Sequence, residues 1–99
     1  MAFANIADWN QLLANKVVFI TGAGGRVAKH LAKACYAQGA RLILGDLNSM
    51  LMNEVIKELN VNDDRVLVVT LDVTDETSIE LAVQTAIEKW KTIDVLLNV

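Results

Sequence analysis

Residues 17–30 read VVFITGAGGRVAKH, an apolar run followed by a glycine cluster and then by a helical pattern. β-Branched and aromatic residues fill the apolar run, which predicts a buried strand over residues 16–20. Beyond the glycines, apolar side chains recur at helical spacing over residues 26–38, and Gly39 is placed to end that helix. A strand that turns sharply into a helix through glycines is typical of a phosphate-binding turn, although a simple bend in the chain is the alternative.

Gly22, Gly25 and Ala28 follow the spacing G-x-x-G-x-x-A within this turn. Glycine permits a positive φ and close backbone approach to a pyrophosphate, and the start of the helix offers free N–H groups. The third small residue lets the helix pack closely on the strand, and alanine serves there with little loss. Arg26 replaces a glycine only if the spacing is T-G-x-x-x-G-x-G. Under G-x-x-G-x-x-A it is a free position whose guanidinium can face a phosphate.

The rest of the chain alternates between strand and helix patterns. Asn48 or Ser49 is placed to cap the second helix, and Thr74 or Asp75 the third. The strands are continuously apolar, which indicates a parallel sheet covered on both faces. The order β-α-β-α-β-α-β with right-handed crossovers predicts a Rossmann-like, doubly wound α/β sheet in strand order 3-2-1-4. The further predicted elements are a lead-in helix over 5–14, strands over 40–44, 65–71 and 93–97, a turn over 60–64, and helices ending at 59 and spanning 76–90.

Length and composition fit a single domain. The chain has 99 residues, of which 54% are hydrophobic, and its single cysteine, Cys35, has no partner for an internal disulfide. We therefore expect one domain over residues 1–99 in a reducing, cytoplasmic setting. Since no apolar run approaches the roughly 20 residues of a membrane span, we expect no membrane association.

Charge is distributed unevenly along the chain. Residues 1–45 hold five basic residues and one acidic residue, whereas residues 46–99 hold four basic and eleven acidic residues. The basic part surrounds the glycine turn and suits an anionic ligand, but ordinary surface charge explains it equally well. The net charge of −3 and the absence of a dense basic stripe from the sequence argue against a nucleic-acid partner. The lone histidine, His30, stands on a polar helix face, so we expect no metal site.

Asp46 follows the second predicted strand, twenty-four residues after Gly22. A carboxylate at this place accepts hydrogen bonds from an adenosine ribose and repels a 2′-phosphate, so NAD is favoured over NADP. Two basic residues, Arg26 and Arg41, are expected to soften that preference. An aspartate that only caps a helix or a turn is the alternative, and the spacing from the glycines favours ribose binding.

Four stretches of the chain, taken together, resemble the N-terminal part of a short-chain dehydrogenase/reductase. They are KVVFITGAGG, LILGD, LDVTDETSIE and IDVLLN, and the resemblance covers roughly residues 12–98. It implies an α/β Rossmann fold, a single partial NAD(P)-binding domain over residues 1–99, and an NAD(P)-dependent oxidoreductase. The full-length protein would transfer hydride between a nicotinamide cofactor and a carbonyl or alcohol.

The resemblance also implies which residues meet the cofactor. Asp46, with Leu47 beside it, would meet the adenosine ribose. Asp72 and Val73 would lie against the adenine ring, and Asn98 would match the first asparagine of the family's N-N-A-G motif. The candidate residues of the phosphate turn are Thr21, Gly22, Gly24, Gly25, Arg26 and Val27.

The chain departs from the family pattern after its fourth predicted strand. Val99 stands where the second asparagine of N-N-A-G belongs, and the family's catalytic Ser, Tyr and Lys come after that point. The only tyrosine, Tyr36, is followed four positions later by Ala40, so the sequence has no Y-x-x-x-K. We therefore expect a truncated chain that is inactive alone. The alternatives are a non-catalytic nucleotide-binding or sensor module and a self-associating structural fragment.

The predicted topology leaves the fourth strand at an edge of the sheet and the third helix alone on one face. Residues 93–99 are strongly apolar, with Asp94 as their one charge. Natural edge strands are usually blunted by charge, proline or cover. We therefore expect homo-oligomers that form through this strand and the face of the third helix, or a longer protein that supplies the cover.

Overall fold

The computed structural model describes residues 12–59 and 64–99, which form a parallel sheet with helices on both faces. Its strand order is β3-β2-β1-β4, so the predicted fold class and topology are confirmed. The lead-in helix predicted over residues 5–14 and the turn predicted over 60–64 fall largely outside the described residues. The elements in chain order are β1 Val17–Thr21, α1 Arg26–Ala37, β2 Arg41–Asp46, α2 Ser49–Leu59, β3 Val66–Thr70, α3 Glu76–Trp90 and β4 Val95–Asn98.

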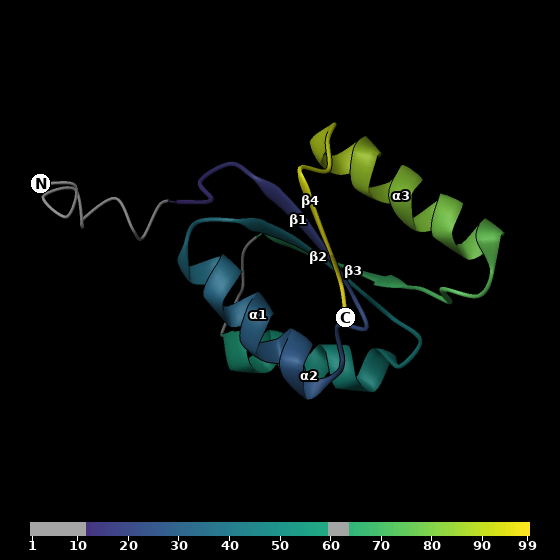
Figure 1. The fold of residues 1–99 in the computed structure, drawn as a ribbon, viewed down its shortest axis with the longest axis horizontal. Helices are drawn as coiled ribbons and strands as arrows, with labels where there is room; N and C mark the ends of the chain where they lie inside the picture. The colour runs from purple at the N-terminus through teal and green to yellow at the C-terminus, as the bar shows by residue number, and fades with distance from the viewer. Residues whose placement is uncertain (1–11, 60–63) are drawn as a thin grey trace, which may run out of the picture.

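The three helices are divided unequally between the faces of the sheet (Figure 1). α1 and α2 lie on one face and α3 lies alone on the other. Successive strand residues point to opposite faces. Accordingly, Val18 and Leu42 belong to the apolar cluster under α1 and α2, whereas Phe19 and Ile43 belong to the cluster under α3.

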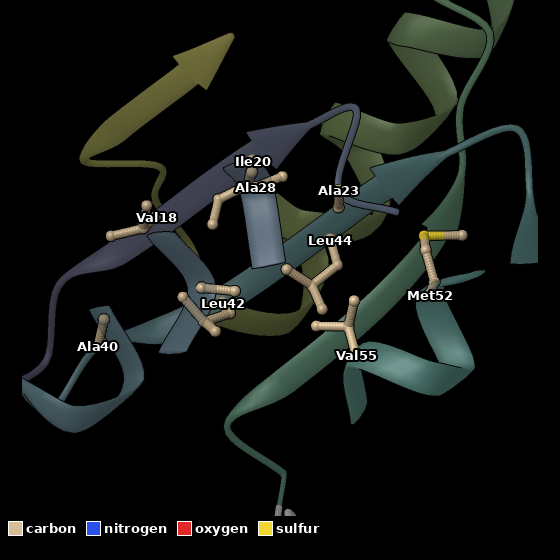
Figure 2. Close-up of a cluster of buried hydrophobic side chains, with 10 residues drawn as sticks. Val18, Ile20, Ala23, Ala28, Ala40, Leu42, Leu44, Met52 and Val55 are labelled. Carbon is tan, nitrogen blue, oxygen red and sulfur yellow. The ribbon is translucent and has the colours of Figure 1, made fainter. Parts of the chain in front are cut away.

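The core under α1 and α2 depends on small side chains where the helix approaches the sheet. Ala28 and Ala32 of α1 are fully buried, as is Ala23 in the turn that precedes the helix. Met52 and Val55 of α2 complete the same cluster (Figure 2). Alanine at the third position of the glycine turn therefore has the packing role that the spacing predicted.

α3 covers its face of the sheet only in part. Ala82 and Ala86 are buried against the strands, but Ile79 and Val83 of the same helix remain about 40% exposed. Leu96 of the edge strand β4 is 62% exposed. Apolar surface is therefore open between α3 and the β4 edge.

β4 is tied to β1 at both of its ends. Val17 N donates to Asp94 Oδ2 at 2.8 Å, and Asp94 N donates to the Val17 carbonyl oxygen at 2.9 Å. At the other end, the Thr21 hydroxyl donates to Asn98 Oδ1 at 2.7 Å. The hydrogen-bonded partners are 77 positions apart in the sequence, so these side chains join the first and last strands of the sheet.

The described residues include neither a membrane-spanning helix nor a cluster of metal-binding side chains. No helix in residues 12–59 and 64–99 combines the length and the apolar character required to cross a membrane. The same residues contain no group of three or more His, Cys, Asp or Glu side chains arranged to hold a metal ion.

Candidate functional site

The predicted site residues gather at the carboxyl edge of the sheet. Because the four strands are parallel, the loops that follow β1, β2 and β3 leave the sheet on the side where β4 ends. The register places Thr21 beside Asn98 on one side, and Asp46 beside Thr70 on the other. Ligands of open parallel sheets bind outside this edge, so the fold brings the candidates together in a suitable place.

The turn after β1 has no room for side chains at two of its glycines. Gly22 has a φ of 64°, and a Cβ on it would lie 2.8 Å from the Val99 carbonyl oxygen. A Cβ on Gly24 would lie 2.7 Å from Leu51 Cβ of α2. The turn therefore presents backbone at these positions, as the approach of a phosphate group requires.

α1 begins without a side-chain cap. Gly25 is its N-cap residue, no side chain among residues 12–59 and 64–99 caps the first N–H groups, and the first turn contains no acidic residue. By contrast, Asn48 Oδ1 accepts from Leu51 N at 3.2 Å at the start of α2, and Asp75 caps α3. Uncapped N–H groups and the positive end of the helix dipole favour an anion. In the described part of the chain, α1 is thus the helix whose start is suited to a phosphate.

Asp46 connects the glycine turn with the loop that follows β2. Its Oδ2 accepts from Gly24 N at 2.9 Å, and its Oδ1 accepts from Asn48 N at 2.9 Å. Each carboxylate oxygen has two acceptor sites, so the side chain retains capacity for two further hydrogen bonds. Asp46 therefore caps the turn that follows β2, as the alternative interpretation had it, and it also retains acceptor sites for a diol.

The neighbouring candidates are exposed at the same edge. Leu47 is 65% exposed, and Arg26 and Val27 are exposed as the first two residues of α1. Arg41, in contrast, is the first residue of β2, whereas Asp46 is the last. At the rise of a β-strand these two residues are about 16 Å apart. The prediction that Arg41 softens the cofactor preference is therefore wrong, because Arg41 lies at the opposite edge of the sheet.

Asp72 is held by its own loop after β3. Its Oδ1 accepts from the Thr74 hydroxyl at 2.6 Å and from Thr74 N at 2.9 Å, while Asp72 N donates to Ser78 Oγ at 2.9 Å. The hydroxyl, followed by the backbone N–H, lowers the pKa of Asp72 below its ordinary value of 3.8. The Asp72 side chain is therefore an oriented carboxylate at neutral pH.

An apolar hollow of about 330 Å³ lies beside α3. It extends to the carboxyl edge of the sheet, because it is lined by Thr21 and Asn98, the last residues of β1 and β4, and by Leu71, which directly follows β3. The hollow includes Val73, which the resemblance placed against the adenine ring, and Asn98, which it matched to the first asparagine of N-N-A-G. Its lining includes Val73, Ile79, Val83 and Leu96, with Thr21 and Asn98 as polar members.

The sequence prediction did not include several residues that shape the site. Leu51 and Val99 contact Gly24 and Gly22 across the fold, and no local pattern indicates such contacts. Thr74 was considered only as a helix cap, yet its position two residues after an aspartate is typical of a side-chain turn. That spacing is the signal that could have identified its contact with Asp72.

Comparison with known proteins agrees with this geometry. A family model described as short chain dehydrogenase matches residues 16–99. The chain belongs to the short-chain dehydrogenase family. The resemblance seen in the sequence is thereby confirmed, and the parallel sheet and the glycine turn are features of a short-chain dehydrogenase segment.

Similar short-chain dehydrogenases include one curated relative and two solved structures. The 3-hydroxyacyl-CoA dehydrogenase type-2 of Drosophila melanogaster is 38% identical over 87 residues, which are 88% of this chain and 33% of that protein. The 3-ketoacyl-(acyl-carrier-protein) reductase from Brucella melitensis, complexed with NADH, has a TM-score of 0.76 and 31% identity over 85% of this chain and 33% of its own. A hydroxysteroid dehydrogenase from Escherichia coli has a TM-score of 0.81 and 29% identity over 91% of this chain and 38% of its own. The chain spans about a third of the length of the curated relatives it matches.

Proposed function

We propose that this chain is the segment of a short-chain dehydrogenase/reductase that binds the adenosine and pyrophosphate part of a nicotinamide dinucleotide. The observation that carries the proposal is the position of Asp46. Its carboxylate lies 2.9 Å from the Gly24 amide, beside the uncapped start of α1. A diol acceptor and an anion site thus adjoin each other, as an adenosine diphosphate group requires. The NADH complex of the Brucella reductase supports the same assignment.

The residues present fit the phosphate part of this cofactor. Gly22 and Gly24 leave the backbone bare, and the first turn of α1 offers N–H groups without an acidic side chain. In this proposal the pyrophosphate binds along the turn from Thr21 to Val27, with the Arg26 guanidinium available to it. The nicotinamide supplies the hydride chemistry when the cofactor is bound, and that activity belongs to a protein of the relatives' length.

The adenine part is assigned to the loop after β3, where Val73 is 59% exposed. Asp72 presents an oriented carboxylate next to Val73. Such a combination of an apolar surface and a hydrogen-bond acceptor suits a purine with an exocyclic amine.

NAD is proposed as the cofactor in preference to NADP. The Asp46 carboxylate accepts hydrogen bonds from the two ribose hydroxyls of NAD, and its charge repels the 2′-phosphate of NADP. Of the two arginines that were expected to soften the preference, only Arg26 lies at this edge of the sheet.

Calorimetric titration of the chain with four ligands tests this function. We expect NAD and ADP-ribose to bind with similar affinity, because both carry the adenosine and pyrophosphate groups. NADP should bind more weakly, and nicotinamide mononucleotide, which lacks the adenosine, should not bind measurably. Equal affinity for NAD and NADP would contradict the role of Asp46. A folded sample that binds neither NAD nor ADP-ribose would contradict the proposed function itself.

We also propose that the chain forms homo-oligomers through the β4 edge and the face of α3, in the cytoplasm. Leu96 of β4 and Ile79 and Val83 of α3 expose apolar surface next to an unpaired strand edge. Burial raises the pKa of the Cys35 thiol, which disfavours the reactive thiolate, and a single cysteine without a disulfide partner fits a reducing compartment. Sedimentation equilibrium measures the first part of this proposal and cell fractionation the second.

A further inference from the structure

Asp46 contacts the glycine turn directly, and this contact is separate from the ribose binding proposed for it. Gly24 N donates to Asp46 Oδ2 at 2.9 Å, and the two residues are 22 positions apart in the sequence. A hydrogen bond from an amide to an ionised carboxylate is stronger than one to a neutral acceptor. This contact therefore restrains the backbone of the turn from outside the turn.

The same carboxylate is part of a closed ring of contacts. Asp46 Oδ1 accepts from Asn48 N, and Asn48 Oδ1 in turn accepts from Leu51 N in the first turn of α2. Leu51 packs so closely against Gly24 that a Cβ on this glycine would lie 2.7 Å from Leu51 Cβ. Gly24 completes the ring through its amide bond to Asp46. The turn, the loop after β2 and the start of α2 are thus fixed relative to one another.

We propose that Asp46 is a positioning residue, whose carboxylate holds the glycine turn in the shape that receives a pyrophosphate. This inference rests on the proposed function of the turn, and it assigns Asp46 a second role beside the ribose contact. Its consequence concerns cofactor choice. A substitution that removes the carboxylate in order to admit a 2′-phosphate also releases the Gly24 amide, so pyrophosphate affinity falls for both cofactors.

Site-resolved amide hydrogen exchange on the chain without ligand tests the positioning role directly. In Asp46→Ala we expect exchange at the Gly24 amide to accelerate by roughly tenfold to a hundredfold, the range for loss of a hydrogen bond to a charged acceptor. The Ala23 amide is an internal control, because it donates to the Gly45 carbonyl oxygen at 3.0 Å. Its exchange should change much less. An unchanged rate at Gly24, or an equal acceleration at both amides, would overturn the proposal.

Asp46→Asn provides the same measurement if the alanine variant does not fold. The asparagine side chain keeps the shape of aspartate but has one acceptor oxygen for two backbone donors. The neutral amide oxygen is also a weaker acceptor than the carboxylate. We therefore expect faster exchange at the Gly24 amide in this variant, and an unchanged rate at Gly24 would also overturn the proposal.

Binding of inorganic pyrophosphate separates positioning from simple electrostatics. Removal of a nearby negative charge alone should strengthen the binding of an anion. Glu54→Gln, at an exposed position of α2, is the charge-matched control and should leave affinity unchanged or slightly increased. Asp46→Asn should weaken pyrophosphate binding several-fold. An increase in Asp46→Asn that matches or exceeds the control would overturn the proposal.

The two proposals fail in different ways. If the wild-type chain binds neither pyrophosphate nor a dinucleotide, the proposed function fails, and the exchange rates still decide whether Asp46 holds the turn. If the wild-type chain binds NAD but Gly24 exchange does not respond to Asp46, the cofactor site stands and the positioning role is rejected.

Discussion

Gly24 illustrates how a single missing side chain shapes the site. Its backbone lies between the Asp46 carboxylate and the Leu51 side chain, and a Cβ on it would lie 3.2 Å from Asp46 Oδ2 and 2.7 Å from Leu51 Cβ. The neighbouring Gly25 has more space, since the nearest atom to its Cβ would be the Gly22 carbonyl oxygen at 3.3 Å. Within one turn, the two adjacent glycines therefore differ in the space available for a side chain.

Substitution of these two glycines should have unequal effects. Gly24→Ala forces Leu51 and the start of α2 to move, so we expect a loss of about 1–3 kcal/mol in the free energy of unfolding. Gly25→Ala, the control, should cost less because its φ of −78° suits an L-residue. Urea denaturation followed by circular dichroism measures both. Equal losses in the two variants would contradict this prediction, because they would show that Leu51 moves aside at little energetic cost.

Asp72 makes a pH-dependent contribution to stability. Its pKa in the folded chain is lowered by Thr74, so the stabilisation is present above the ordinary value of 3.8 and is lost as the pH falls through the lowered pKa. Thr74→Val removes the larger of the two causes, the hydroxyl donor, and leaves the backbone N–H. We expect the pKa of Asp72 to rise towards 3.8 in this variant, as measured by carboxyl NMR titration. The pKa of Glu58, which Lys33 and Lys29 lower independently, should stay unchanged.

Among the elements, β3 is joined to α1 and β2 through one arginine. Arg65 Nη2 donates to the carbonyl oxygens of Tyr36 at 2.7 Å and of Ala40 at 2.9 Å, and its guanidinium lies 3.8 Å from the centroid of the Tyr36 ring. It thereby satisfies a carbonyl in the last turn of α1 and one directly before β2. Arg65, which directly precedes β3, is 29 positions from Tyr36 and 25 from Ala40, so its side chain joins the start of β3 to the junction between α1 and β2.

Arg65→Lys should therefore be destabilising although the charge is conserved. An ammonium group lacks the planar fork that reaches both carbonyls while it stacks on a ring. We expect a loss of about 1–2 kcal/mol, corresponding to one hydrogen bond from a charged donor. Arg41→Lys is the matched control, because Arg41 begins the adjacent strand and shows no side-chain hydrogen bond in the described residues. A similar loss in both variants, by chemical denaturation, would contradict the role given to Arg65.

The order and type of the elements were predictable from the sequence because apolar runs and helical spacing are local signals. The ends of the strands were less so, since they depend on pairing. β2 extends to Asp46, where it pairs with Thr70, and β1 extends to Thr21, where it pairs with Asn98. In both cases the prediction ended the strand at the last apolar residue, before the polar residue that has a partner in the neighbouring strand.

The part of the candidate site that depends on the spacing of residues along the sequence was predictable. The positions of Gly22 and Asp46 at the ends of two strands follow from the alternation of elements, and the structure brings both to one edge of the sheet. The bond from Gly24 to Asp46 and the contact of Gly24 with Leu51 depend on how α2 packs beside the turn. Such packing has no counterpart in the local sequence.

For the whole molecule, the main asymmetry is that two helices cover one face and one helix covers the other. The α3 face carries an apolar hollow of about 330 Å³, and β4 forms the adjacent edge of the sheet. Exposed apolar patches beside an unpaired edge are typical of interaction surfaces. This asymmetry is the basis for the proposed self-association.

A lysine placed on this surface should weaken self-association. Leu96 is 62% exposed on β4 and lines the hollow, whereas Leu81 is 58% exposed on α3 and does not. In sedimentation equilibrium we expect Leu96→Lys to shift the chain towards monomer, because a charge at the edge opposes strand pairing. Leu81→Lys should behave like the wild type. A wild-type chain that is monomeric at micromolar concentration would contradict the proposed assembly.

The hydrogen bonds that join β1 to β4 have a consequence for synthesis on the ribosome. Asp94 is synthesised 77 positions after Val17, its hydrogen-bond partner. At ordinary rates of translation, this delay is about 4–15 seconds. During that interval one side of β1 is without its neighbour while its apolar residues already exist as nascent chain. β1, an interior strand of the finished sheet, is thus an edge strand during this interval, when aggregation and chaperone binding compete for exposed apolar strands.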